Sequence, residues 1–216
     1  MSEQGKTNQR PADVYFFATC VVDQFFPGAG LDAITLLERE GIRVHFPEEQ
    51  TCCGQPAYTS GFRDEARKVA AQQLTLFPEN WPVVVPSGSC AGMMKHHYPT
   101  LFAKDPARQA AAEKLSARIY EFTQFLVDVL NFKPEDVGSE CTVVLHTSCS
   151  ARREMGVHLT GRQLLGDLNH VTVAQQDHES ECCGFGGTFS VKQPEISAAM
   201  VEDKVKSLKA TGAERV

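Results

Sequence analysis

The chain has 216 residues, with a hydrophobic content of 42% and a charged content of 22%, and these values are ordinary for a globular protein. Lys and Arg number 21 against 27 Asp and Glu, so the net charge is −6, which argues against a nucleic-acid partner. No apolar run is long enough for a transmembrane segment, and the polar N-terminus lacks the apolar stretch of a secretory signal. We therefore expect a cytoplasmic protein.

The first part of the chain is expected to alternate strands and helices after a polar, disordered tail at residues 1–13. Hydrophobic patterning predicts a strand before Cys20, helices at 28–40 and 61–77, and strands at 42–46 and 82–86. The clearest helical pattern runs from 111 to 130, because its apolar residues recur at helical spacing: Leu115, Ile119, Phe122, Leu126 and Val129. This first half is taken as residues 14–133.

The remainder, residues 134–216, repeats the same order of elements. It predicts a strand ending near Cys149, a helix at 161–168, a strand at 171–173, a helix at 194–210 and a new strand from 214. Strand–helix–strand order predicts parallel pairing through crossover helices. We therefore expect an α/β fold of two related halves, each with a parallel sheet, related by a pseudo-two-fold rotation.

The cysteines follow the same repeat. Cys20 is followed 32 positions later by Cys52-Cys53-Gly54, and Cys149 is followed 33 positions later by Cys182-Cys183-Gly184. Cys90 lies 37 positions after Cys53, and only Cys141, which we expect to be a buried structural thiol, stands outside the pattern. Thiols stay reduced in the cytoplasm, so metal or cluster ligation explains the pattern better than disulfides. The predicted ligands are Cys20, Cys52, Cys53, Cys90, Cys149, Cys182 and Cys183.

Thiolates bind both iron–sulfur clusters and zinc. The side chains of adjacent cysteines diverge, so they reach different irons of a cluster more readily than one small ion, and this favours a cluster over zinc. Gly54 and Gly184 allow the backbone to approach closely, and their N–H groups are expected to donate hydrogen bonds to the sulfurs.

Several segments resemble the lactate utilization protein A family, which carries the cysteine-rich CCG domain also found in heterodisulfide reductase and in the iron–sulfur subunit of glycolate oxidase. The resemblance rests on PEEQTCCGQPAY, VPSGSCAGM, EFTQFLVDVL and ECCGFGGTFSVKQPEISAAMVEDKVK. It implies that the cysteines hold iron–sulfur clusters of the 4Fe-4S type. It also implies an electron-transfer subunit of a complex that oxidises L-lactate to pyruvate.

The partners implied by this resemblance are two companion lactate-utilization subunits, a ferredoxin-type iron–sulfur protein and a third protein. Two alternatives stay open. One is a zinc-stabilised module whose role is assembly, and the other is a thiol/disulfide redox subunit like the cysteine-rich subunit of heterodisulfide reductase.

Two departures from the family pattern carry expectations of their own. Met93 stands where the first Cys-x-x-Cys has its last cysteine, so we expect Met93 to pack in the core. The second half's distal cysteines would fall beyond Val216, so we expect the chain to be truncated there and the second ligand set to be incomplete.

Overall fold

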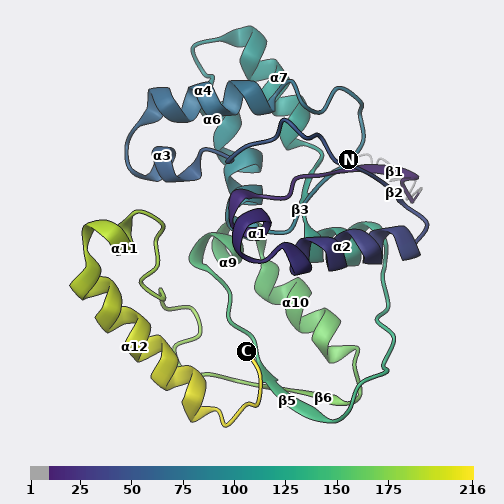
Figure 1. The fold of residues 1–216 in the computed structure, drawn as a ribbon, viewed down its shortest axis with the longest axis vertical. Coiled ribbons are helices and arrows are strands. Elements are labelled where there is room, and N and C mark those ends of the chain that lie inside the picture. Colours follow the sequence, from purple (N-terminus) through teal and green to yellow (C-terminus); the bar gives the residue numbers. More distant parts are fainter. Residues whose placement is uncertain (1–9) are drawn as a thin grey trace, which may run out of the picture.

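The computed structural model describes residues 10–216, so most of the expected tail at 1–13 lies outside the described residues. Its larger sheet has four parallel strands in the order β2-β1-β3-β4 (Figure 1). These strands are β1 (Asp13–Phe16), β2 (Arg43–His45), β3 (Val83–Val85) and β4 (Ile119–Glu121). The parallel pairing expected for the first half is confirmed.

Crossover helices cover both faces of this sheet. Between the strands lie α1 (Cys20–Phe25), α2 (Pro27–Arg39), α3 (Gln55–Thr59), α4 (Arg63–Gln73), α5 (Gly88–Gly92), the π-helix η1 (Met93–His97), α6 (Tyr98–Leu101) and α7 (Pro106–Ser116). In Figure 1, α4, α6 and α7 lie above the sheet, whereas α2 and α10 (Val157–Gly166) lie below it.

The alternation of side chains along the strands builds two cores, one on each face. Tyr15 and Val83 pack in the core on the face that is covered by α4, α5, α6 and α7. The neighbouring Phe16 and Val84 pack in the core on the opposite face, which is covered by α2. Cys53 and Cys90 are part of the first core. Met93 is fully buried beside them, which confirms that it packs.

The expected long helix at 111–130 is wrong. The chain leaves α7 at Ser116, forms β4, and then turns through α8 (Phe122–Gln124) and the π-helix η2 (Phe125–Val129). Ile119 pairs with Val83 in the sheet, and Arg118 donates to the carbonyl oxygens of Phe77 and Trp81 at the edge of β3. Sheet pairing satisfies these backbone groups, so tertiary contacts override the helical spacing.

The second half has a smaller parallel sheet, formed by β5 (Cys141–Val144) and β6 (Val171–Ala174). Its helices are α9 (Cys149–Met155), α10, α11 (Phe189–Lys192) and α12 (Pro194–Ala210). A parallel bridge joins Val143 to Arg215. The strand β5 therefore has β6 on one side and residue 215 on the other, just as β1 has β2 and β3. This order confirms two related halves, while the rotation between them stays a prediction.

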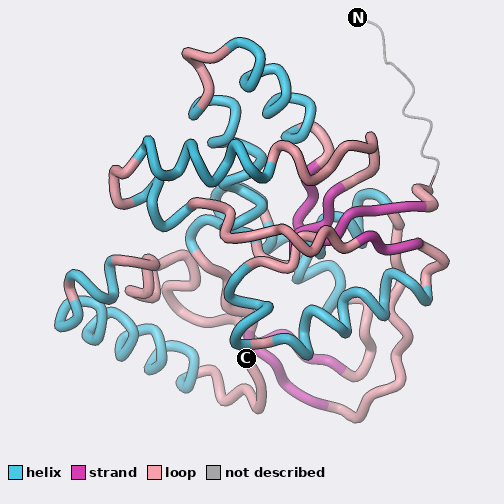
Figure 2. Tube along the Cα trace, turned by 45° about the horizontal axis from the view of Figure 1, so that its top comes forward, coloured by secondary structure: helices cyan, strands magenta, loops and turns pink. Residues whose placement is uncertain are grey.

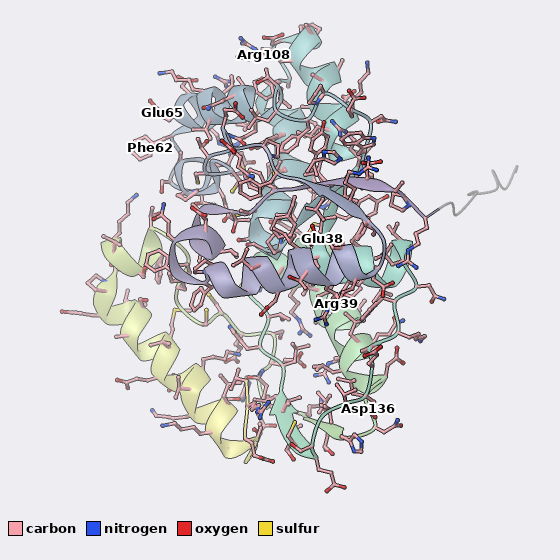
Figure 3. All side chains as sticks on the ribbon, turned by 45° about the vertical axis from the view of Figure 1, so that its right-hand side comes forward. Glu38, Arg39, Phe62, Glu65, Arg108 and Asp136 are labelled. Atoms are coloured by element: carbon pink, nitrogen blue, oxygen red, sulfur yellow. The ribbon has the colours of Figure 1, made fainter. Side chains whose placement is uncertain are left out.

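The linker at 131–140 is tied to the second sheet. The carboxylate of Asp136, which is labelled in Figure 3, accepts a hydrogen bond at 2.7 Å from the backbone N–H of Asn169, two residues before β6. The loops and turns that connect these elements are pink in Figure 2. Among residues 10–216, no helix is long and apolar enough to cross a membrane.

Candidate functional site

Four thiols of the first half meet at the carboxyl edge of the larger sheet. Cys20 begins α1, Cys52 and Cys53 lie in the loop between β2 and α3, and Cys90 lies in α5. The thiol of Cys52 is close enough to those of Cys20 and Cys53 for each to shift the other's pKa, and the thiols of Cys53 and Cys90 act on each other in the same way. The structure therefore brings neighbouring members of this set together, and one common site for all four stays a prediction.

The pKa values alternate along this chain of sulfurs. Hydrogen bonds from the Cys53 thiol, the Gly54 N–H and the Cys20 thiol lower the pKa of Cys52 to about 6, although burial opposes the shift. Burial and the neighbouring Cys52 thiolate raise the pKa of Cys20 to about 11. The pKa of Cys53 is also raised, by its hydrogen bond to Cys52, whereas hydrogen bonds from Cys53 and from Ser87 lower the pKa of Cys90. Close thiols share protons in this way, and a bound cationic metal centre deprotonates its thiol ligands outright.

The second half gathers three thiols in the same manner. Cys149 begins α9, and the thiols of Cys182 and Cys183 are close enough to it to shift its pKa. Burial and then Cys182 raise the pKa of Cys149, and the positive charge of Arg153 opposes them. The structure therefore brings Cys149, Cys182 and Cys183 together and keeps Cys141 apart at the far end of β5, where it is partly exposed rather than buried as expected.

The loops that carry the paired cysteines are nearly identical in backbone geometry. Gly54 has a φ of 84° and Gly184 a φ of 83°, both in the left-handed region that favours glycine. The N–H of Gly54 donates to the sulfur of Cys52 at 3.4 Å, and the N–H of Gly184 donates to the sulfur of Cys182 at 3.4 Å. The expected N–H···S contacts at both glycines are thus present in the structure.

A hydroxyl residue precedes the leading cysteine in each half. Thr19 is the N-cap of α1 and accepts from the N–H of Val22 at 3.4 Å, and Ser148 is the N-cap of α9 and accepts from the N–H of Ala151 at 3.3 Å. Helix capping therefore holds Cys20 and Cys149 in the first turn of a helix. This role was not predicted, although the pairs Thr-Cys and Ser-Cys before each helix are a usable capping signal.

Cavities open beside both groups of thiols. One of about 430 Å³ is lined by Thr19, Cys20 and Cys52, together with the acidic residues Asp23 and Glu48. Another of about 460 Å³ is lined by Cys182, His178 and Lys204 among others. Solvent-sized molecules can therefore reach one edge of each thiol group, whereas Cys53 and Cys90 are buried.

The two halves pack directly through α5 and α9, the helices that carry Cys90 and Cys149. A Cβ atom added to Gly88 would overlap the Cβ of Ala151 and lie 2.6 Å from its Cα. A Cβ atom added to Gly92 would lie 3.2 Å from the Cβ of Glu154. The α5–α9 seam, defined by Gly88, Gly92, Ala151 and Glu154, therefore fixes the two thiol groups relative to each other.

The donor groups of both halves are thiols. Among residues 10–216, no group of three or more His, Cys, Asp or Glu side chains is arranged to hold a metal ion. Backbone N–H groups donate to the sulfurs of Cys52 and Cys182. Thiolates are ligands of both zinc and iron–sulfur clusters.

The regions that are similar to known proteins include both thiol groups. A family model described as a cysteine-rich CCG domain matches residues 14–95 and 143–216, and each matched segment contains one thiol group. The chain is 46% identical over 204 residues to lactate utilization protein A of Shouchella clausii, covering 94% of this chain and 84% of that relative. It is 47% identical over 204 residues to lactate utilization protein A 1 of Bacillus mycoides, covering 93% and 82%. It is 46% identical over 194 residues to lactate utilization protein A of Geobacillus kaustophilus, covering 89% and 80%.

Proposed function

Because the chain belongs to the lactate utilization protein A family, with its repeated cysteine-rich CCG domain, we propose that it is an iron–sulfur electron-transfer subunit of a complex that oxidises L-lactate to pyruvate. The observation that carries this proposal is the meeting of Cys20, Cys52, Cys53 and Cys90 at one edge of the sheet. A 4Fe-4S cluster bound there would accept and donate single electrons.

The chain's own residues would hold and tune such a cluster. Cys20, Cys52, Cys53 and Cys90 would ligate it in the first half, and Cys149, Cys182 and Cys183 would contribute to a site in the second half. Gly54 and Gly184 would donate N–H groups to the ligand sulfurs, which stabilises negative charge on sulfur. The buried core around Cys53 and Cys90 would exclude water from one side of the first site.

Oxidation of lactate to pyruvate releases two electrons, which must leave the substrate and reach an acceptor. We propose that this chain carries electrons between companion subunits, a ferredoxin-type iron–sulfur protein and a third protein, in the cytoplasm, where its thiols stay reduced. The names of its relatives, which refer to lactate utilization, support this assignment.

A thiol/disulfide redox role is the second candidate. It is favoured by the contact between Cys20 and Cys52, whose side chains both line the cavity of about 430 Å³ and are open to a small substrate. Turnover of a disulfide substrate by the purified protein would support this role. A zinc-stabilised assembly module stays as the third reading, because zinc also takes thiolate ligands.

Anaerobic purification with iron, sulfide and zinc counted per chain tests the proposal. We expect iron and sulfide in equal amounts, visible absorption, and a loss of iron in Cys52→Ser and in Cys182→Ser. Cys141→Ser is the matched control, because Cys141 lies outside both groups, and it should keep the wild-type iron content. Stoichiometric zinc without sulfide would contradict the electron-transfer role and support the assembly module.

A further inference from the structure

Large apolar side chains are exposed around the leading cysteine of the first half. Val21 and Phe25 of α1 are 47% and 71% exposed, and they lie on one side of the helix because they are one helical turn apart. Phe46, which directly follows β2, is 46% exposed and lines the same cavity as Cys20 and Cys52. No residue of α1 is buried. Exposed apolar side chains grouped in this way are typical of a surface that contacts another protein.

The charged residues in the wall of this cavity are all acidic. They are Asp23 and Glu48, and the next residue, Glu49, is also exposed. Residues 17–38 and 46–62, which include α1 and the Cys-Cys-Gly loop, contain no lysine or arginine. Across residues 10–216, no ion pair neutralises these three carboxylates. We call this surface the acidic face, and it is defined by Val21, Asp23, Phe25, Phe46, Glu48 and Glu49.

The corresponding surface of the second half carries the opposite charge. Counted from the leading cysteine of each half, Asp23 corresponds to Arg152 and Gln24 corresponds to Arg153. The positive charge of Arg153 acts on the thiol of Cys149. Two copies of one repeat therefore differ in charge at this place, so the acidic face belongs to the first half and is not a requirement of the fold.

The acidic face lies at the open edge of the first thiol group. Cys20 and Cys52 line the cavity there, whereas Cys53 and Cys90 are buried in the core on the other side. An electron that leaves or enters a cluster at this group would therefore cross the least protein through the acidic face. A redox partner that docks at this face would come closest to the cluster.

We propose that the acidic face is the docking surface for a companion redox protein whose own docking surface carries lysine or arginine side chains around an apolar centre. Complementary charge steers the encounter of two proteins, and apolar contact slows their separation. The passage of electrons through this face rests on the proposed function, but the docking itself does not require a bound cluster.

Cytochrome c, a small redox protein with lysines around its haem edge, is the probe that tests this proposal. Carbodiimide coupling of the anaerobically purified full chain to cytochrome c at low salt joins lysines to the carboxylates that they touch. We expect the coupled peptides to contain Asp23, Glu48 and Glu49. When the iron-loaded chain has been reduced with dithionite and freed of it, one electron should pass from each reduced cluster to the ferric haem.

The double variant Glu48→Gln, Glu49→Gln should slow this reduction of cytochrome c about tenfold at low ionic strength and flatten its dependence on salt, with iron content unchanged. The matched control is Glu195→Gln, Glu202→Gln, which removes the same charge from exposed positions of α12 and should keep the wild-type rate. Phe25→Ser should lower the coupling yield and leave the salt dependence unchanged, because it removes apolar contact and no charge.

Three results would overturn the docking surface. One is an equal loss of rate in the α12 control, which would mean that net charge alone attracts the probe. Another is coupling spread over carboxylates outside the acidic face. The third is coupling of the chain to a second copy of itself through the acidic face, which would identify a different occupant. Coupling at the acidic face without reduction of the haem would support the docking surface and contradict the electron-transfer function.

Discussion

At the scale of single residues, adding one methyl group should cost more at Gly184 than at its counterpart Gly54. A Cβ atom there would lie 2.7 Å from the carbonyl oxygen of Ser197 and 2.8 Å from the Cβ of Met200, whereas at Gly54 the nearest atom is at 3.4 Å. The left-handed backbone alone costs an alanine about 1–2 kcal/mol. Gly54→Ala should therefore lose about that much stability in urea unfolding and Gly184→Ala should lose more.

Gly28→Ala is the matched control for these two variants, because Gly28 lies inside α2 with open space around it. Alanine in a helix is favoured over glycine by about 1 kcal/mol, so this variant should be neutral or more stable. Equal losses at Gly54 and Gly184 would mean that the contact with α12 is looser than the structure shows.

Glu121 predicts a pH dependence of stability. This carboxyl group is buried at the end of β4, and burial raises its pKa even though Thr123 and Gln124 donate hydrogen bonds to it. When the pKa of an acid is higher in the folded state than in the unfolded state, ionisation above the folded-state pKa lowers the free energy of unfolding. This penalty disappears as the pH falls toward the unfolded-state pKa. Glu121→Gln cannot titrate, so wild type should gain unfolding free energy relative to this variant between pH 7 and pH 5. A constant difference across that range would contradict the assignment.

At the scale of elements, the α5–α9 seam should be destabilised by a methyl group added at Gly88 and should tolerate one added at Gly92. A Cβ atom on Gly88 meets both the Cβ and the backbone Cα of Ala151, so a helix must shift, and overpacking of this kind costs about 1–3 kcal/mol. A Cβ atom on Gly92 meets mainly the carboxylate end of Glu154, which can rotate away. Urea unfolding should show Gly88→Ala as the more destabilised variant.

A double-mutant cycle checks that the loss arises at the seam. Ala151→Gly removes the atom that overlaps the new methyl group, so the double variant Gly88→Ala, Ala151→Gly should recover part of the loss. If the changes in unfolding free energy of the two single variants simply add in the double variant, the loss does not arise from the contact between Gly88 and Ala151. The seam was not predicted, although the spacing of Gly88 and Gly92 in SGSCAG is one helical turn and marks a face that a second helix can approach closely.

At the scale of the whole molecule, the two halves should differ in local stability. The helix α4 buries Ala66 and Ala70 in the first core, whereas α12 leaves Ile196 and Val201 54% and 44% exposed. Backbone amides with fewer buried apolar contacts open more readily. Hydrogen exchange of the metal-free, reduced chain should therefore be faster in peptides from 194–210 than in peptides from 63–73. Equal protection of the two sets of peptides from exchange would show that polar contacts, such as the hydrogen bond from Lys204 to the carbonyl oxygen of His178, hold α12 as firmly as an apolar core holds α4.

Repetition is the reason that much of the fold could be predicted. The helix at 194–210 begins at Pro194 and ends at Ala210 as expected, and the paired strands of both halves follow from short apolar runs. The helix at 111–130 failed because Leu115 and Ile119 are buried equally well by a helix and by a turn into β4. Only the pairing of Ile119 with Val83, a long-range contact, decides between them.

The candidate site was predictable in its cysteines and glycines and not in their surroundings. The spacings of 32 and 33 residues before Cys-Cys-Gly led to six of the thiols and to Gly54 and Gly184, and Cys90 was added because it follows a predicted strand. The burial of Gln73 and Lys204 needed the structure, because Gln and Lys in an amphipathic helix are ordinarily solvent-exposed.

The α5–α9 seam also constrains how this sequence can diverge. Gly88 and Ala151 belong to different copies of the repeat, yet they compete for the same volume, so a larger residue at either position requires a smaller one at the other. Substitutions in one copy of the repeat are therefore limited by the sequence of the other copy, at positions that carry no cysteine. The two copies of the repeat are therefore coupled at positions that take no part in the predicted ligand sets.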